Sequence, residues 1–310
     1  MHLETSHRAV RHFGHAGQVL AIHYRNTIRL FQESASEWSA DNAQRLGAAL
    51  AFYTLLSLAP VLIVVVGVAA LAFGRQAASG QLAWEMGHLV GQQGARAVQS
   101  LIQASYQPAT GLLATGLSIV TVIFGASSVV VELRDDLNLI WRCREASSGV
   151  SGVITIIKDR FYSFVLVVVA GLVLVFLLAV SVVVAAVGQF FPSGLPVPQI
   201  MLHAVTFLFS FLVITFLFAA IYKALPNVKL KWSDVAVGAA VTSLIFEIGK
   251  QLIGLYLGKA GFTSTYGAAG SLVVLLVWVY YSAQLFFFGA EFTKVYARRF
   301  GSRVAENVGG

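Results

Sequence analysis

Long runs of apolar residues dominate the chain and decide what it can fold into. A helix needs about 20 consecutive apolar residues to cross a bilayer, and several runs reach or exceed that length. The runs are approximately residues 46–73, 110–131, 161–190, 200–222, 235–257 and 270–295. The sequence therefore predicts an all-α, polytopic membrane helix bundle with six transmembrane helices.

The composition supports a membrane protein. Hydrophobic residues make up 57% of the 310 residues and charged residues only 11%, whereas soluble domains have about 25% charged residues. The net charge of +7 comes from basic residues between the apolar runs, where membrane topology and anionic headgroups account for it, so we expect no nucleic-acid partner. The single cysteine, Cys143, excludes an intramolecular disulfide and a CxxC metal site. We expect no cofactor and no metal.

The distribution of basic residues predicts the topology. Of the 21 Lys and Arg residues, 17 lie on the side of the two termini and three on the opposite side, with Lys250 inside a span. Cytoplasmic loops carry the excess of Lys and Arg. We therefore expect a multi-pass protein of a bacterial inner membrane with both termini in the cytoplasm. Residues 1–45 would form a cytoplasmic tail and an amphipathic helix, 46–299 the membrane domain, and 300–310 a second tail.

Two segments have the periodicity of interfacial helices. From Gln18 to Trp38, apolar residues recur every three or four positions, and the segment from Glu132 to Arg160 repeats the pattern. We expect Trp141 to lie at headgroup level. The segment 74–109 is too polar to span and would cap the outer face. Whether it forms a lid is left open.

A carboxylate cluster opens the second of these segments. Glu132, Asp135 and Asp136 could bind a hard cation. Three arginines surround them, so we expect ion-paired surface residues instead.

The first two spans carry packing signals. Pro60 predicts a bend in the first span, because proline removes one helical hydrogen bond. Gly47 and Ala51 form a small-xxx-small pair that allows another helix to approach closely. In the second span a stripe that includes Gly125 and Ser128 predicts close helix packing, with a polar pathway lining as the alternative.

Two ionisable residues, Glu247 and Lys250, lie inside the fifth span. Such residues cost roughly 2.5–3.5 kcal/mol each on insertion scales and usually have a partner or a purpose. Matching the depths of the last two spans places four polar residues nearby: Tyr280, Tyr281, Ser243 and Gln284. This candidate intramembrane site is either a structural polar lock or a site for an ion, a proton or a lipid headgroup. Glu291 has Lys294 three residues on, and this pair indicates no special role.

Several stretches resemble the YihY/BrkB family of bacterial inner-membrane proteins, formerly mislabelled as ribonuclease BN. They are ALAFYTLLSLAPVLIV in the first span, ELRDDLNLIW after the second, LPNVKLKWSDVAVGA before the fifth, FEIGKQLIGLYL within it, and YGAAGSLVVLLVWVYYSAQLFFFGAEFTKVYAR across the sixth. The resemblance implies an α-helical membrane protein without a settled molecular activity. It also implies links to serum resistance and to the movement of lipids toward the outer envelope.

We therefore expect transport or handling of a lipid or another envelope molecule. The alternative is a non-transporting scaffold or partner in envelope assembly. Ribonuclease activity is the least favoured, because the chain offers no clustered acid, base or metal-binding groups, and we expect no enzyme and no catalytic residues. Membrane lipids and envelope proteins are the expected partners. The substrate, transport direction, energy coupling and oligomeric state are left open.

Overall fold

The protein is built from helices throughout the part of the chain that the computed structural model describes. The described residues are 26–74, 80, 99–100, 112–143, 160–169, 171–173, 176, 196–259 and 270–301. The predicted tail before residue 26, nearly all of the outer segment 74–109, and the end of the chain after residue 301 lie outside this part.

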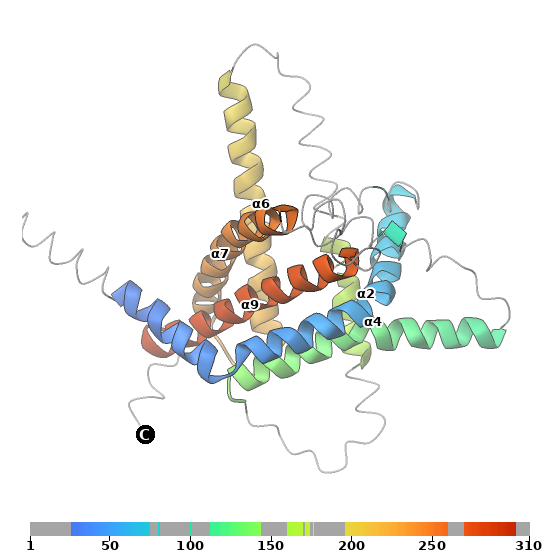
Figure 1. Cartoon of the computed structure of the whole chain (residues 1–310), viewed down its shortest axis with the longest axis horizontal. Helices are drawn as coiled ribbons and strands as arrows, with labels where there is room; N and C mark the ends of the chain where they lie inside the picture. Colours follow the sequence, from blue (N-terminus) through green and yellow to red (C-terminus); the bar gives the residue numbers. More distant parts are fainter. Residues whose placement is uncertain are drawn as a thin grey trace, which may run out of the picture.

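Among the described residues, five long helices form the bundle, together with an N-terminal helix at residues 26–40 (Figure 1). They are α2 (Ala43–Phe73), α4 (Leu112–Ile140), α6 (Pro196–Ala224), α7 (Trp232–Lys259) and α9 (Gly270–Arg299). In this part of the chain, four stretches are long and apolar enough to cross a membrane: Ala43–Val68, Phe207–Ala224, Trp232–Leu257 and Leu272–Arg299. A shorter apolar helix runs from Arg160 to Val173. The protein is thus a multi-pass helical membrane protein, and the count of six spans stays a prediction.

The N-terminal helix and α2 are joined at Asn42, which has φ 53° and ψ 41°. Asparagine adopts this left-handed conformation at lower cost than most residues, so the chain can turn sharply here. The helix α2 then continues through Pro60, and Figure 1 shows its axis changing direction along its length. A β-carbon on Gly125 of α4 would lie 2.6 Å from Cγ of Pro60. The predicted small-residue face of α4 therefore packs closely against the proline ring.

The helix α4 extends further than predicted. Residues 132–140 continue the helix instead of starting a separate interfacial helix. The reason is packing, because Leu137 and Ile140 lie on the buried face of α4 and are fully buried in the main core. Trp141 is only 4% exposed in the same core, so its side chain packs inside the bundle, and its place at headgroup level stays a prediction.

The helix α6 begins at Pro196, inside the predicted Pro-rich connection 191–199. Proline is compatible with the first turn of a helix, where its missing N–H has no intrahelical partner to lose. At its other end, the loop to α7 is fastened to α4, since the backbone N–H of Asn227 donates to Oδ1 of Asn138 at 2.7 Å. Two of the stretches that carry the family resemblance are thereby in contact.

The helices α6, α7 and α9 meet at Tyr222, which is fully buried. Its hydroxyl donates to the carbonyl oxygen of Phe286 at 2.7 Å and lies 3.4 Å from Oγ1 of Thr242. The burial of a large aromatic ring with a satisfied hydroxyl ties α6 to α9.

The N-terminal helix lies beside the C-terminal end of α9 (Figure 1). Leu30 packs against Phe292 and Val295, and the ring of Phe31 stacks on Phe288 at 6.2 Å between centroids. Ile28, which belongs to the predicted apolar stripe, is exposed. The face that contacts α9 is therefore rotated from the predicted stripe toward Leu30.

Candidate functional site

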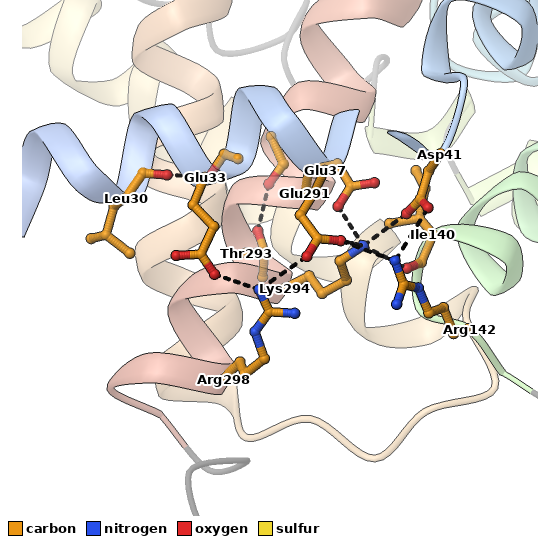
Figure 2. Close-up of polar contacts among 12 residues, drawn as sticks. Leu30, Glu33, Glu37, Asp41, Ile140, Arg142, Glu291, Thr293, Lys294 and Arg298 are labelled. Atoms are coloured by element: carbon orange, nitrogen blue, oxygen red, sulfur yellow. Dashed lines mark hydrogen bonds and ion pairs between the residues drawn. The ribbon is translucent and has the colours of Figure 1, made fainter. Parts of the chain in front are cut away.

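Two rows of charged side chains face each other where the N-terminal helix lies on α9 (Figure 2). One row is acidic and has a spacing of four residues, which places its members on one helix face. The other row, on α9, has spacings of three and four residues. The eight residues of this charge network are Glu33, Glu37 and Asp41; Glu291, Lys294, Arg298 and Arg299; and Arg142 after α4.

Lys294 lies at the centre of the charge network. Its Nζ is 2.6 Å from Oε2 of Glu291, 2.8 Å from Oδ2 of Asp41 and 3.0 Å from Oε2 of Glu37. It also donates to the carbonyl oxygen of Ile140, the last residue of α4, at 3.0 Å. Carbonyls at the end of a helix have no intrahelical partner and favour a cation. One ammonium group therefore connects the N-terminal helix, α4 and α9.

Three arginines complete the charge network. Arg298 contacts Glu33 and Glu37, and Arg299 pairs with Glu33. Arg142, with φ 50°, reaches Glu37 at 3.3 Å. The side chain of Arg142 is 66% exposed and that of Lys294 only 10% exposed. The pairs of Lys294 are therefore the least screened by solvent.

The carboxyl groups of Glu37 and Asp41, which lie outside the spans, stay ionised. Burial acts to raise the pKa of Glu37 and Asp41, but hydrogen bonds and charges from the neighbouring cations, Lys294 first, leave both values below their ordinary 4.5 and 3.8. Oxygens of Glu37, Asp41 and Glu291 lie within 4.8 Å of one another, a spacing that could hold a metal ion. The ammonium group of Lys294 already contacts all three, and Arg142 and Arg298 supply further positive charge, so the arrangement favours a structural clamp over a metal centre.

A second feature is an apolar cavity of about 340 Å³ between α2, α4, the helix Arg160–Val173 and α6. All of its lining residues are apolar: Val61, Val65, Val129, Val130, Leu133, Leu166, Val167, Val169, Val173, Phe216, Leu217, Ala220, Ile221, Ala224 and Leu225. Phe216 and Val169 are also exposed on the outside of the bundle. The cavity therefore reaches the outer surface of the bundle.

Within the described residues, hydrogen bonds do not join the intramembrane residues singled out in the sequence into one network. Lys250 pairs with Glu247 on the same face of α7. Gly249 lies against Tyr281, because a β-carbon there would be 3.2 Å from the tyrosine hydroxyl. Tyr280 is exposed. Within the described residues, neither tyrosine hydroxyl bonds the Glu247 carboxylate.

The other two predicted members point elsewhere. Ser243 is buried and donates to the carbonyl oxygen of Ala239 in its own helix at 2.9 Å. Gln284 reaches α2, where its Nε2 lies 3.4 Å from the carbonyl oxygen of Gln44 and against Gly47. The predicted close approach at Gly47 is thus confirmed, and α9 is the helix that approaches.

Sequence reasoning missed the charge network. It treated Glu291 and Lys294 as an isolated pair on one helix. The charge network could have been predicted from the acidic row at Glu33, Glu37 and Asp41. Their spacing places three carboxylates on one helix face, which indicates cationic residues on a neighbouring helix. What the sequence did not supply was the identity of that neighbour.

The carboxylate cluster at the end of α4 also differs from expectation. Asp136, which lies beyond the predicted span 110–131, is 5% exposed and is not a surface residue. Burial, with the charges of Glu132 and Asp135, raises its pKa to about 7. Its Oδ2 has no hydrogen-bond partner among the described residues.

Comparison with known proteins gives a family match across most of the chain. The model of the family described as virulence factor BrkB matches residues 34–307. A UPF0761 membrane protein of Aeromonas salmonicida is 27% identical over 262 residues, which cover 83% of this chain and 86% of that protein. One of Teredinibacter turnerae is 25% identical over 280 residues, 90% of this chain. One of Tolumonas auensis is 28% identical over 180 residues, 58% of this chain.

The matches cover 63% of the Teredinibacter protein and 56% of the Tolumonas protein, less than two thirds of either. No solved structure matches the chain.

Proposed function

The chain belongs to the virulence factor BrkB family of membrane proteins, and from that premise we propose that it handles a membrane lipid, whose acyl chain enters the apolar cavity. The relatives that it matches are named UPF0761 membrane proteins, a name that assigns no activity. The proposal therefore rests on the site.

The observation that carries it is the purely apolar lining of a cavity that opens on the outer surface of the bundle, which we infer faces lipid. A volume of about 340 Å³ is within the range of ligand sites, about 300–1,000 Å³. Walls without donors or acceptors cannot orient a polar solute, and they disfavour water. In a bilayer the abundant apolar ligand next to such an opening is an acyl chain.

Topology is part of the proposal. The N-terminal helix and the ends of α4 and α9 meet at the charge network, and the sequence places most basic residues on this side. We infer that this end faces the cytoplasm from a bacterial inner membrane. Handling of a lipid in this membrane does not require catalysis, and we propose no enzymatic role.

A photoreactive lipid tests the proposal. Purified protein in phospholipid nanodiscs would be irradiated with a phospholipid that carries a diazirine near the end of one acyl chain. Peptide mass spectrometry should then find crosslinks in residues that line the cavity, such as Val129, Leu166 and Leu217. Ala220→Phe fills the cavity and should lower this labelling several-fold.

The matched control is Ala236→Phe, because Ala236 is exposed on α7 and lies outside the cavity. It should leave cavity labelling unchanged, with both variants melting near the wild type. Labelling spread evenly over the exposed surface, or insensitive to Ala220→Phe, would contradict the proposal.

A scaffold in envelope assembly is the second candidate function. The observation that favours it is the N-terminal helix, which is fastened to α9 by ion pairs while Ile28 stays exposed. The scaffold function predicts that Ala220→Phe retains biological activity in complementation of an envelope defect, whereas Ile28→Asp loses it. Lipid handling predicts loss with Ala220→Phe.

A further inference from the structure

Arg160 begins the apolar helix that forms one wall of the cavity. Its Nη1 donates to Oγ of Ser128 at 3.1 Å and lies 3.4 Å from Oγ of Ser127, and its guanidinium carbon stands 5.6 Å from the centre of the Phe124 ring. All three partners are neutral. Within the described residues, no carboxylate pairs with Arg160.

The lack of a carboxylate partner distinguishes Arg160 from five other cations of the described residues. The five that form ion pairs with carboxylates are Arg142, Lys250, Lys294, Arg298 and Arg299. Beyond the two serines, the neighbours of Arg160 include the exposed aromatic side chains Phe124, Phe161 and Tyr162. A cation at the start of an apolar helix, among such side chains, is costly unless an anion compensates it.

Arg160 lies next to the cavity. Ser127 and Ser128 directly precede Val129 and Val130, which line it. On its own helix, Arg160 is six residues before the lining residue Leu166, a rise of about 9 Å at 1.5 Å per residue. A lipid whose chain fills the cavity therefore has its polar end within reach of the guanidinium.

We propose that Arg160 binds the phosphate of a phospholipid whose acyl chain occupies the cavity, an inference that rests on the proposed function. A guanidinium has five N–H donors in a fork that matches phosphate oxygens. The two serines engage only Nη1. Within the described residues, no partner engages Nη2 or Nε, so the hydroxyls position the group and leave these donors for the phosphate.

The serines are themselves held in place. Oγ of Ser128 donates to the carbonyl oxygen of Phe124 at 2.7 Å, and Oγ of Ser127 donates to the same carbonyl at 3.1 Å. Both hydroxyls therefore turn their lone pairs toward Arg160. They are positioning residues and need not touch the lipid.

The test compares two lipids with identical acyl chains, phosphatidylglycerol and diacylglycerol, which lacks phosphate. Delipidated full-length protein in detergent would be titrated with each, and bound lipid counted by native mass spectrometry. The wild type should prefer phosphatidylglycerol about tenfold, the ratio that a charge-assisted hydrogen bond supports. Arg160→Gln should bring this ratio close to one without weakening diacylglycerol binding.

Further variants separate phosphate binding from a purely structural role. Arg160→Lys keeps the positive charge but lacks the planar guanidinium, so it should restore part of the preference for phosphatidylglycerol over diacylglycerol. Ser128→Ala should reduce this preference partly. Arg45→Gln removes an exposed arginine of α2 and should leave the ratio unchanged. Millimolar inorganic phosphate should not displace phosphatidylglycerol, because it lacks the chain that fills the cavity.

The outcomes keep the two proposals apart. Equal binding of both lipids by the wild type, or an unchanged ratio in Arg160→Gln, would overturn the phosphate site and leave lipid handling intact. Displacement of phosphatidylglycerol by inorganic phosphate would also overturn the phospholipid site, because it would mean that Arg160 binds free phosphate. Binding of neither lipid by the wild type would remove the proposed function itself.

Discussion

The side chain of Thr293 on α9 lies against Gly238 on α7, so close that a β-carbon on the glycine would be 2.7 Å from Cβ of the threonine. The relationship is reciprocal, because Thr242 on α7 lies in the same way against Gly289 on α9. Each threonine hydroxyl donates at 2.7 Å to the carbonyl of the glycine four residues before it. Two helices can approach this closely only where small residues meet.

Gly238→Ala should therefore destabilise the bundle. The added carbon forces α7 and α9 apart, and overpacking of this kind costs about 1–3 kcal/mol. The thermal unfolding midpoint in detergent should fall. Gly254→Ala is the matched control in the same helix, because a β-carbon there meets nothing within 4 Å. Equal midpoints for the two variants would mean that the contact is looser than the structure has it.

Lys294→Met should destabilise the junction of the N-terminal helix with α9. It leaves the buried Glu291 without its cation and removes one of the two cations of the half-buried Asp41, and breaking a buried pair by removing one partner costs about 3–5 kcal/mol. Limited proteolysis should release the N-terminal helix faster.

Arg142→Gln is the control for Lys294→Met, since it removes a cation of the same charge network whose side chain is largely exposed. Its effect should stay within about 1 kcal/mol. Similar proteolysis of both variants would show that the buried lysine does not hold the clamp.

The charge network should also make stability depend on pH. The pKa values of Glu37 and Asp41 are lower in the folded protein than the ordinary 4.5 and 3.8. An acid of this kind contributes stability that is present above its unfolded pKa and is lost as pH falls through its folded pKa. Unfolding midpoints of the wild type should therefore fall as pH drops below about 4.5.

Glu37→Gln removes one of these titrations. The variant should begin less stable at neutral pH and lose less between about pH 5 and pH 3, so that the two curves converge. The difference between the curves isolates Glu37 from the other acids. Parallel curves over this range would contradict the assigned role of its ion pairs.

Several of the long helices could be predicted from the sequence, because a long apolar run favours a membrane helix. The bounds of α2, α7 and α9 fall within a few residues of prediction. Local sequence patterns led to wrong predictions where packing between helices determines the structure. The charged start of ELRDDLNLIW suggested an interfacial helix, but Leu137 and Ile140 keep α4 continuous and bury Trp141.

The candidate sites were harder to predict, since they depend on which helices are neighbours. Matching depths brought Tyr281 near the level of Glu247, but depth says nothing about direction around a helix, and Gln284 turns toward α2 instead. The apolar cavity has no local signature at all. Its walls are mostly valines and leucines, with one phenylalanine, one isoleucine and two alanines, and the cavity exists because these side chains do not fill the space between the helices.

The pair Glu247 and Lys250 offers the last prediction. It lies outside the lining of the apolar cavity, and its two side chains compensate each other on one face of α7. If it takes part in transport, Glu247→Gln and Lys250→Met should each fold normally yet fail to complement an envelope defect. A purely structural pair predicts that each single variant is destabilised, because it leaves one charge unpaired in an apolar span, whereas the double variant regains stability. Measuring expression, unfolding midpoint and complementation for the two single variants and the double variant therefore decides between a polar lock and a working site.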